Sequence, residues 1–232
     1  MYYSFGIALI QKNGPLYEIL LTQKRNTYAF IDFINARYKS EEDLLTLFSK
    51  MTNDECFLIL SLDFDKIYYR YTLISDSYSE AYALYKENRY AMLKKIFEKN
   101  ARRYKFKNLM ARAMPDVANE ELWEIPRGRR ALPDELPINC AQREFEEETE
   151  ISPEKYTQTM ESFTIIQDEI YEITYFFAIS EAIIPRLNIL NYLQISEVKD
   201  IRFVPLKDLY FYNIYAKDVI RYNVKKFIKA HF

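Results

Sequence analysis

The most constraining feature of this 232-residue chain is a short acidic run, CAQREFEEETEI, at positions 140–151. Five glutamates fall between positions 144 and 150. Three of them, Glu144, Glu147 and Glu148, stand at i, i+3 and i+4, so a helix places their carboxylates on one face. Like charges at these spacings destabilise an isolated helix by about 0.2–0.5 kcal/mol per pair. Water, basic side chains or a divalent cation with oxygen ligands must offset this repulsion.

Residue usage excludes several kinds of functional site. The single histidine, His231, rules out Ser-His-Asp, Cys-His and histidine-rich zinc chemistry. The three glycines are too few and too scattered for a dinucleotide fingerprint or a phosphate loop. Two distant cysteines fit no disulfide or metal pattern, and neither a run of about 18 apolar residues nor a signal peptide occurs. We therefore expect a cytoplasmic protein that does not cross a membrane and in which carboxylates carry the chemistry.

Residue patterning predicts an α/β fold with strands towards both ends of the chain. Residues 4–11 and 17–25 read as two strands joined by the turn sequence KNGPL. Further strands are expected at 121–128, 162–167, 171–180 and 198–206, and helices at 139–150 and 216–232. Asn139 is the expected N-cap of the acidic helix.

The middle of the chain has helix signals. Ser40 precedes one helix, Thr52 and Glu55 form a capping box for a second, and a third is expected over 79–112. Because no linker or low-complexity tract separates these parts, we expect an insertion within one fold. The predicted division is a core at 1–35 and 120–232 with a mostly helical insertion at 36–119.

The order strand, Gly128, loop, Glu135 and then REFEEETEI resembles the Nudix hydrolase signature, G-x5-E-x7-R-E-U-x-E-E-x-G-U, where U is bulky and aliphatic. Seven positions agree in register: Glu135, Arg143, Glu144, Phe145, Glu147, Glu148 and Ile151. The interval from Gly128 to Glu135 is one residue longer than the pattern, and Glu150 replaces the closing glycine. The resemblance implies a Nudix α/β/α sandwich with a mixed sheet, and hydrolysis of a diphosphate linked to another group.

The same resemblance implies roles for individual residues. Glu144, Glu147 and Glu148 would hold Mg²⁺ or Mn²⁺, which neutralises phosphate charge and activates water. Arg143 would pair with Glu135 and hold the loop against the helix. The candidates for a catalytic base outside the motif are Glu197, which we favour, and then Asp168, Glu169 and Glu172.

Three further stretches, LLTQKRNTYAFIDFINARY, LDFDKIYYRY and LWEIPRGR, are similar to the mRNA-decapping Nudix enzymes of large cytoplasmic DNA viruses, of the African swine fever virus type. In those enzymes a helical insertion helps to bind RNA. The insertion here carries a basic segment with interleaved aromatic residues, comprising Arg89, Lys94, Lys95, Lys99, Arg102, Arg103, Lys105, Lys107 and Arg112. Such a segment suits an RNA backbone, although a solvated helix with its aromatics in the core has the same pattern. Arg127 and Arg130 beside Gly128 are candidates for contacts to cap or RNA phosphates, the alternative being loop solubility.

The expected function is metal-dependent removal of the 5′ cap of mRNA in the host cytoplasm, with release of methylated GDP and 5′-monophosphate RNA. Two alternatives stay open. One is a Nudix diphosphohydrolase that acts on diphosphoinositol polyphosphates or free nucleotides. The other is a non-catalytic RNA-binding protein with a Nudix fold, which the intact carboxylates argue against. The sequence leaves the oligomeric state open.

Overall fold

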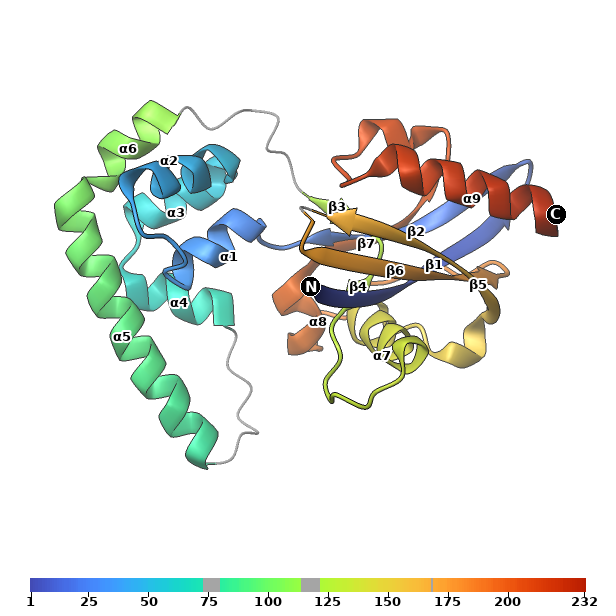
Figure 1. Cartoon of the computed structure of the whole chain (residues 1–232), viewed down its shortest axis with the longest axis horizontal. Coiled ribbons are helices and arrows are strands. Elements are labelled where there is room, and N and C mark those ends of the chain that lie inside the picture. The colour runs from blue at the N-terminus through green and yellow to red at the C-terminus, as the bar shows by residue number, and fades with distance from the viewer. Residues whose placement is uncertain (73–79, 114–121, 168) are drawn as a thin grey trace. The chain divides into compact units, whose positions relative to one another are not determined.

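The computed structural model describes residues 1–72, 80–113, 122–167 and 169–232, which form two compact units (Figure 1). One is an α/β unit of residues 1–24 and 122–232, and the other is a helical unit of residues 25–121. The helical unit begins at Arg25, earlier than the boundary expected at 36, because Phe30 and Phe33 of the first helix pack into its core.

The described residues of the α/β unit form a seven-stranded sheet. Its strands are β1 (Tyr2–Asn13), β2 (Leu16–Lys24), β3 (Trp123–Glu124), β4 (Arg127–Gly128), β5 (Thr157–Gln167), β6 (Tyr171–Ser180) and β7 (Val198–Pro205). Its helices are α7 (Pro137–Thr149), α8 (Tyr192–Glu197) and α9 (Lys217–His231), with 3-10 turns η1 (Pro153–Lys155) and η2 (Asp208–Phe211). The strands pair in the order β3-β2-β1-β6-β5, with β7 on β2 and β4 on β1.

The sheet is mixed and has a helix on each face. β1 and β6 are parallel, whereas the other pairs are antiparallel. α7 covers one face and α9 the other (Figure 1). Phe145 of α7 packs with Phe5 and Leu9, while Phe227 of α9 packs in one core cluster with Phe163. The predicted α/β/α sandwich with a helical insertion is therefore confirmed.

Residues 123–128 separate β1 from β2 at one end of the sheet. β1 pairs with β2 only near their turn, from Ile10 opposite Ile19 onward. Further along, β3 pairs with β2 and β4 pairs with β1, while β7 and β6 fill the outer edges of β2 and β1. Because a strand has only two edges, β3 and β4 must lie between β1 and β2. A side chain at Gly6 would overlap the carbonyl oxygen of Pro126, so the close approach requires glycine there.

The helical unit contains α1 (Tyr28–Ile34), α2 (Glu41–Lys50), α3 (Asn53–Ser61), α4 (Phe64–Thr72), α5 (Glu80–Tyr104) and α6 (Phe106–Ala113). α2 and α3 begin at capping boxes on Ser40 and Thr52, as the sequence predicts. The third expected helix is broken at Lys105, which has φ 49°, so that Phe106 turns into contact with Phe33 and Phe48. None of the described helices has the length and apolar character of a membrane span.

The ends of α7 differ from the expectation in one respect. The helix begins at Pro137 after Leu136, so Asn139 lies inside it and the predicted N-cap is wrong. Proline suits the first turn because its φ is preset and its missing N–H has no partner there. At the other end Glu150 takes the left-handed conformation, with φ 55°. Its Oε1 accepts hydrogen bonds from the side-chain amides of Asn188 (2.9 Å) and Asn191 (2.8 Å), which help to offset the strain of replacing glycine.

Candidate active site

Glu144 of α7 lies directly against the backbone of β4. A Cβ atom at Gly128 would overlap the Glu144 carboxylate, so glycine lets this carboxylate approach the strand despite the longer loop that follows. Burial raises the pKa of Glu144, and the charges of Glu147 and Glu197 raise it further, while Arg143 lowers it. The carboxylate is thus held in a partly dry, negatively charged setting.

Arg143 ties the acidic helix to the loop that precedes it. Its Nε and Nη2 donate to the two carboxylate oxygens of Glu135 at 2.9 and 3.3 Å, a forked pair. Nη1 donates to Glu144 at 2.8 Å and to Glu147 at 3.2 Å, and Nη2 also donates to the carbonyl of Arg129 at 2.8 Å. The hydrogen bond from Arg143, with one from the backbone of Ala131, lowers the pKa of Glu135. One guanidinium therefore positions three carboxylates and a loop carbonyl.

Glu148 is the most deeply buried of the three motif glutamates, with 3% of its surface exposed. Lys24 Nζ lies 2.7 Å from its Oε1, and Thr22 Oγ1 donates to its Oε2 at 3.2 Å. Burial raises the pKa of Glu148, and the charge of Glu124 raises it further, whereas Lys24 opposes the rise. A buried carboxylate with a specific charge partner in such a setting is typical of a functional site.

Two charged residues of this cluster, Lys24 and Glu124, were not predicted from the sequence. Lys24 Nζ is 3.0 Å from Glu124 Oε1, and Glu124 Oε2 is 3.3 Å from Arg127 Nη2. Positive and negative side chains therefore alternate along a row, which we call the buried ionic row. It consists of Arg127, Glu124, Lys24 and Glu148. Thr22 and Lys24 were an available signal, because residues two positions apart share one face of a strand.

The structure places the two arginines beside Gly128 differently. Arg127 belongs to the buried ionic row and also donates to Ser4 Oγ at 3.3 Å. Arg130 is exposed, with its guanidinium 5.2 Å from the ring centroid of Phe5. Of the two, Arg130 is thus the more accessible to a phosphate.

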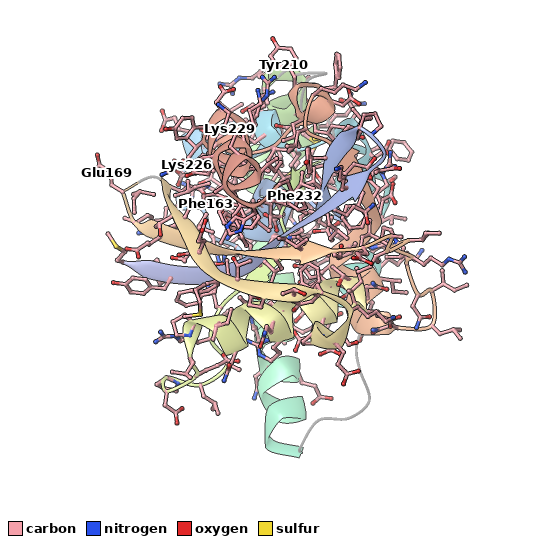
Figure 2. The ribbon with its side chains drawn as sticks, turned by 90° about the vertical axis from the view of Figure 1, so that its right-hand side faces the viewer. Phe163, Glu169, Tyr210, Lys226, Lys229 and Phe232 are labelled. Carbon is pink, nitrogen blue, oxygen red and sulfur yellow. The ribbon has the colours of Figure 1, made fainter. Side chains whose placement is uncertain are left out.

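Glu197, the favoured base, ends α8 and is exposed, and its Oε2 lies 4.0 Å from Lys24 Nζ. Its charge raises the pKa of both Glu144 and Glu148, so it lies within electrostatic reach of the cluster. Glu169 lies in the turn between β5 and β6 (Figure 2). Glu172 follows in β6. Asp168 lies outside the described residues.

Gln194 connects α8 to the end of α7. This buried side chain donates from Nε2 to the carbonyl of Glu148 at 3.0 Å, and its Oε1 accepts from the backbone of Asn188 at 2.8 Å. The connection holds the segment that carries Glu197 beside the acidic helix. No sequence motif pointed to Gln194.

The donor set of the cluster suits a hard divalent cation, because carboxylate oxygens are preferred ligands of such ions. Burial raises the pKa of Glu144 and Glu148, and the charge of Glu197 adds to both shifts, so a cation bound here would relieve repulsion. In the described parts of the chain, no three Asp, Glu, His or Cys side chains are grouped for immediate ligation. Arg143 and Lys24 hold the carboxylates instead, so binding of a cation requires an exchange of partners.

The basic residues predicted to bind RNA differ in exposure within the helical unit. Lys95, Lys99 and Arg102 are exposed at i, i+4 and i+7 of α5, and we call them the α5 basic row. The others that are exposed are Arg103, Lys105, Lys107 and Arg112. Lys94 is half-buried, and its Nζ lies 2.8 Å from Asp65 Oδ2. The interleaved aromatics Tyr90, Phe97, Tyr104 and Phe106 all pack on the core of the unit.

Comparisons with known proteins agree with this architecture. A family model described as NUDIX domain matches residues 102–226. The chain is 34% identical over 145 residues to mRNA-decapping protein g5R of a Namibian warthog isolate of African swine fever virus, covering 60% of this chain and 54% of that one. It is 33% identical over 161 residues to g5R of a Kenyan pig isolate, covering 66% and 61%. The chain thus spans somewhat more than half the length of these relatives.

Among solved structures, an Ap4A hydrolase of C. elegans in a binary complex has a TM-score of 0.48 and 14% identity, with 100% of both chains covered. The assignment rests on the family model, which matches more than half of the chain. It rests also on Gly128, Glu135, Arg143 and the three motif glutamates, which meet in one cluster. The chain belongs to the Nudix hydrolase family.

Proposed function

We propose that this protein removes the 5′ cap of mRNA by hydrolysis within the cap triphosphate, releasing methylated GDP and 5′-monophosphate RNA. The observation that carries the proposal is the 33–34% identity to viral proteins named as mRNA-decapping proteins. The exposed α5 basic row supports it, because a long polyanion needs a surface that neutralises phosphates. Since the relatives come from a virus, the host cytoplasm is the proposed setting.

The charged cluster supplies the parts that such a reaction needs. Glu144, Glu147 and Glu148 are the proposed ligands of the divalent ions that Nudix enzymes generally use, here Mg²⁺ or Mn²⁺. When bound, such an ion neutralises phosphate charge and lowers the pKa of a water molecule. Arg143 keeps the carboxylates and the 128–135 loop in register, and exposed Glu197 is the proposed acceptor of the proton from the attacking water.

A direct assay tests the substrate. Capped RNA labelled in the cap, diphosphoinositol polyphosphates and free nucleotides are supplied at equal concentration with Mg²⁺ or Mn²⁺. We expect release of methylated GDP from the RNA to be the fastest reaction. Equal or faster turnover of the small molecules would make a Nudix diphosphohydrolase the better description. A chain that binds RNA but cleaves none of these compounds would be a non-catalytic RNA-binding protein.

A second experiment tests the α5 basic row. Replacing Lys95, Lys99 and Arg102 by glutamine should weaken RNA binding for any sequence and flatten its salt dependence. Each phosphate that the protein no longer neutralises lowers the magnitude of d log K/d log[salt] by about 0.7 for a single strand. Lys94→Gln is the matched control on the same helix, because Lys94 pairs with Asp65. An unchanged slope in the triple variant would exclude the α5 basic row from RNA binding. Turnover of a free cap analogue should stay the same in every variant.

A further inference from the structure

Tyr2, Tyr171 and Arg129 form a partly exposed aromatic cluster in the α/β unit. Tyr2 of β1 pairs in register with Tyr171 of β6, and their rings stack with centroids 5.3 Å apart and an interplanar angle of 27°. The guanidinium of Arg129 lies 5.3 Å from the centroid of Tyr2 and 5.8 Å from that of Tyr171. Tyr2 is 56% exposed and Arg129 is also exposed. Strand pairing thus holds two rings and a cation together at the surface.

The loop that carries Arg129 is the one that contacts the acidic helix. Arg129 follows Gly128, which packs against Glu144, and the Arg129 carbonyl accepts from Arg143 at 2.8 Å. Ser4, two residues after Tyr2 and therefore on the same face of β1, donates to the carbonyl of Gly128 at 2.9 Å. The aromatic cluster is thereby fixed to the backbone that positions the proposed metal ligands.

We propose that Tyr2, Tyr171 and Arg129 stack a neutral nucleobase of the substrate beside the diphosphate that is cleaved. This inference rests on the proposed function and names the part of the substrate that the cluster recognises. Bases stack on tyrosine rings and on guanidinium planes. The single tryptophan is not available for this purpose, because Trp123 is buried with Arg202 4.8 Å from its ring and Tyr212 at its edge.

The charge of Arg129 decides which base fits. Guanine methylated at N7 is a cation and meets a like charge at Arg129, whereas an unmethylated base is neutral and stacks without that repulsion. In a capped mRNA the neutral base nearest the triphosphate belongs to the first nucleotide of the RNA. The cluster therefore binds the RNA side of the cap, and the methylated guanine lies elsewhere.

Binding without turnover provides the test. The full chain is titrated calorimetrically, in buffer without divalent metal, with methylated cap dinucleotide, unmethylated cap dinucleotide and inorganic triphosphate. Stacking contributes about 1–3 kcal/mol per base, so Tyr2→Leu should weaken both dinucleotides by about fivefold or more. Inorganic triphosphate, which has no base, should bind Tyr2→Leu as it binds the wild type. Tyr2→Phe, which keeps the ring, should bind like the wild type.

Tyr3→Leu is the matched control. Tyr3 is 51% exposed and is the next residue of β1, so it projects from the opposite face of the strand. Arg129→Ala provides a second variant outside the strand, and it should weaken dinucleotide binding without changing the melting temperature. Equal affinities in the wild type, Tyr2→Leu and Arg129→Ala would overturn the proposal. A greater loss for the methylated than for the unmethylated dinucleotide would overturn the choice of a neutral base. If the wild type cleaved no capped RNA, the proposed decapping function would be rejected. The measured affinities would still show whether Tyr2 and Arg129 bind a base.

Discussion

Glu148 in the α/β unit and Glu55 in the helical unit are both buried glutamates, 3% and 5% exposed, but different partners hold them. Glu55 accepts hydrogen bonds from the backbone N–H groups of Thr27 at 2.6 Å and Thr52 at 2.9 Å, and so joins the starts of two helices. Glu148 instead shares Lys24 with a second buried carboxylate, Glu124. Burial raises the pKa of both glutamates, but only at Glu148 do neighbouring carboxylates add to the rise. Glu55 thus serves the fold, whereas the cluster around Glu148 keeps a repulsion that folding alone does not need.

The largest expected difference between the two glutamates is in turnover. Glu148→Gln should abolish nearly all hydrolysis, because an amide is a poorer ligand than a carboxylate for a hard cation. The loss of rate should exceed the roughly 10- to 100-fold loss of activity that follows removal of a residue hydrogen-bonded to a metal ligand. Steady-state rates at fixed Mn²⁺ concentration measure it, with melting temperature as a check on folding. Glu147→Gln should lose as much activity as Glu148→Gln. Glu55→Gln is the control, and it should hydrolyse a free cap analogue at the wild-type rate. A Glu148→Gln rate close to wild type would reject the ligand assignment.

The next largest effect concerns the stability of the buried ionic row. Lys24→Met leaves Glu124 and Glu148 buried without their shared cation, and breaking such a pair costs about 3–5 kcal/mol. Urea unfolding at neutral pH measures the loss, and adding Glu124→Gln to Lys24→Met should recover part of it. Lys94→Met in the helical unit is the matched control, because its partner Asp65 is solvated, and it should change stability little. Equal losses in both variants would contradict the contrast between the two units.

A smaller effect separates the geometry of the site from the stability of the fold. In Gly128→Ala the new methyl group displaces the Glu144 carboxylate, and a shift of about 1 Å in a catalytic group costs about a hundredfold in rate. We expect a 10- to 100-fold lower kcat, roughly, with little change in unfolding, since only the end of a flexible side chain moves. Gly14→Ala is the control, because Gly14 has φ 56° and open space around it. It should lose about 1–2 kcal/mol of stability without loss of rate.

The smallest expected effect is the pH dependence contributed by Glu55. Burial raises its pKa above 4.5, so the folded state favours its protonated form. Its contribution to stability is present below the unfolded pKa and is lost as pH rises through the folded pKa. Urea midpoints should therefore fall less steeply above pH 4.5 in Glu55→Gln than in the wild type. The pKa shift of Asp43 has the opposite sign, because backbone hydrogen bonds lower its pKa below 3.8. Asp43→Asn should therefore lose stability at neutral pH but not in acid. Parallel curves for Glu55→Gln and the wild type would contradict this account.

Local pattern and the tertiary structure explain different parts of the helical unit. The capping boxes at Ser40 and Thr52 were predictable, because each involves residues three positions apart. The break at Lys105 was not, because it depends on Phe106 reaching Phe33 and Phe48, which lie far away in the sequence. The helical stretch expected over 79–112 is present as α5 and α6, and only the break between them was not foreseen. Packing of distant aromatic rings overrides local helix propensity in this case.

Motif spacing and helix periodicity were enough to establish the family and the face of α7 that carries Glu144, Glu147 and Glu148, because both are local properties of the chain. What these carboxylates contact depends instead on the tertiary structure. Lys24 lies at the end of β2 and Glu124 lies in β3, about a hundred residues later, and β3 and β4 bring them together by entering between β1 and β2. Strand pairing between such distant segments depends on the packing of the whole sheet, and no local spacing in the chain encodes it.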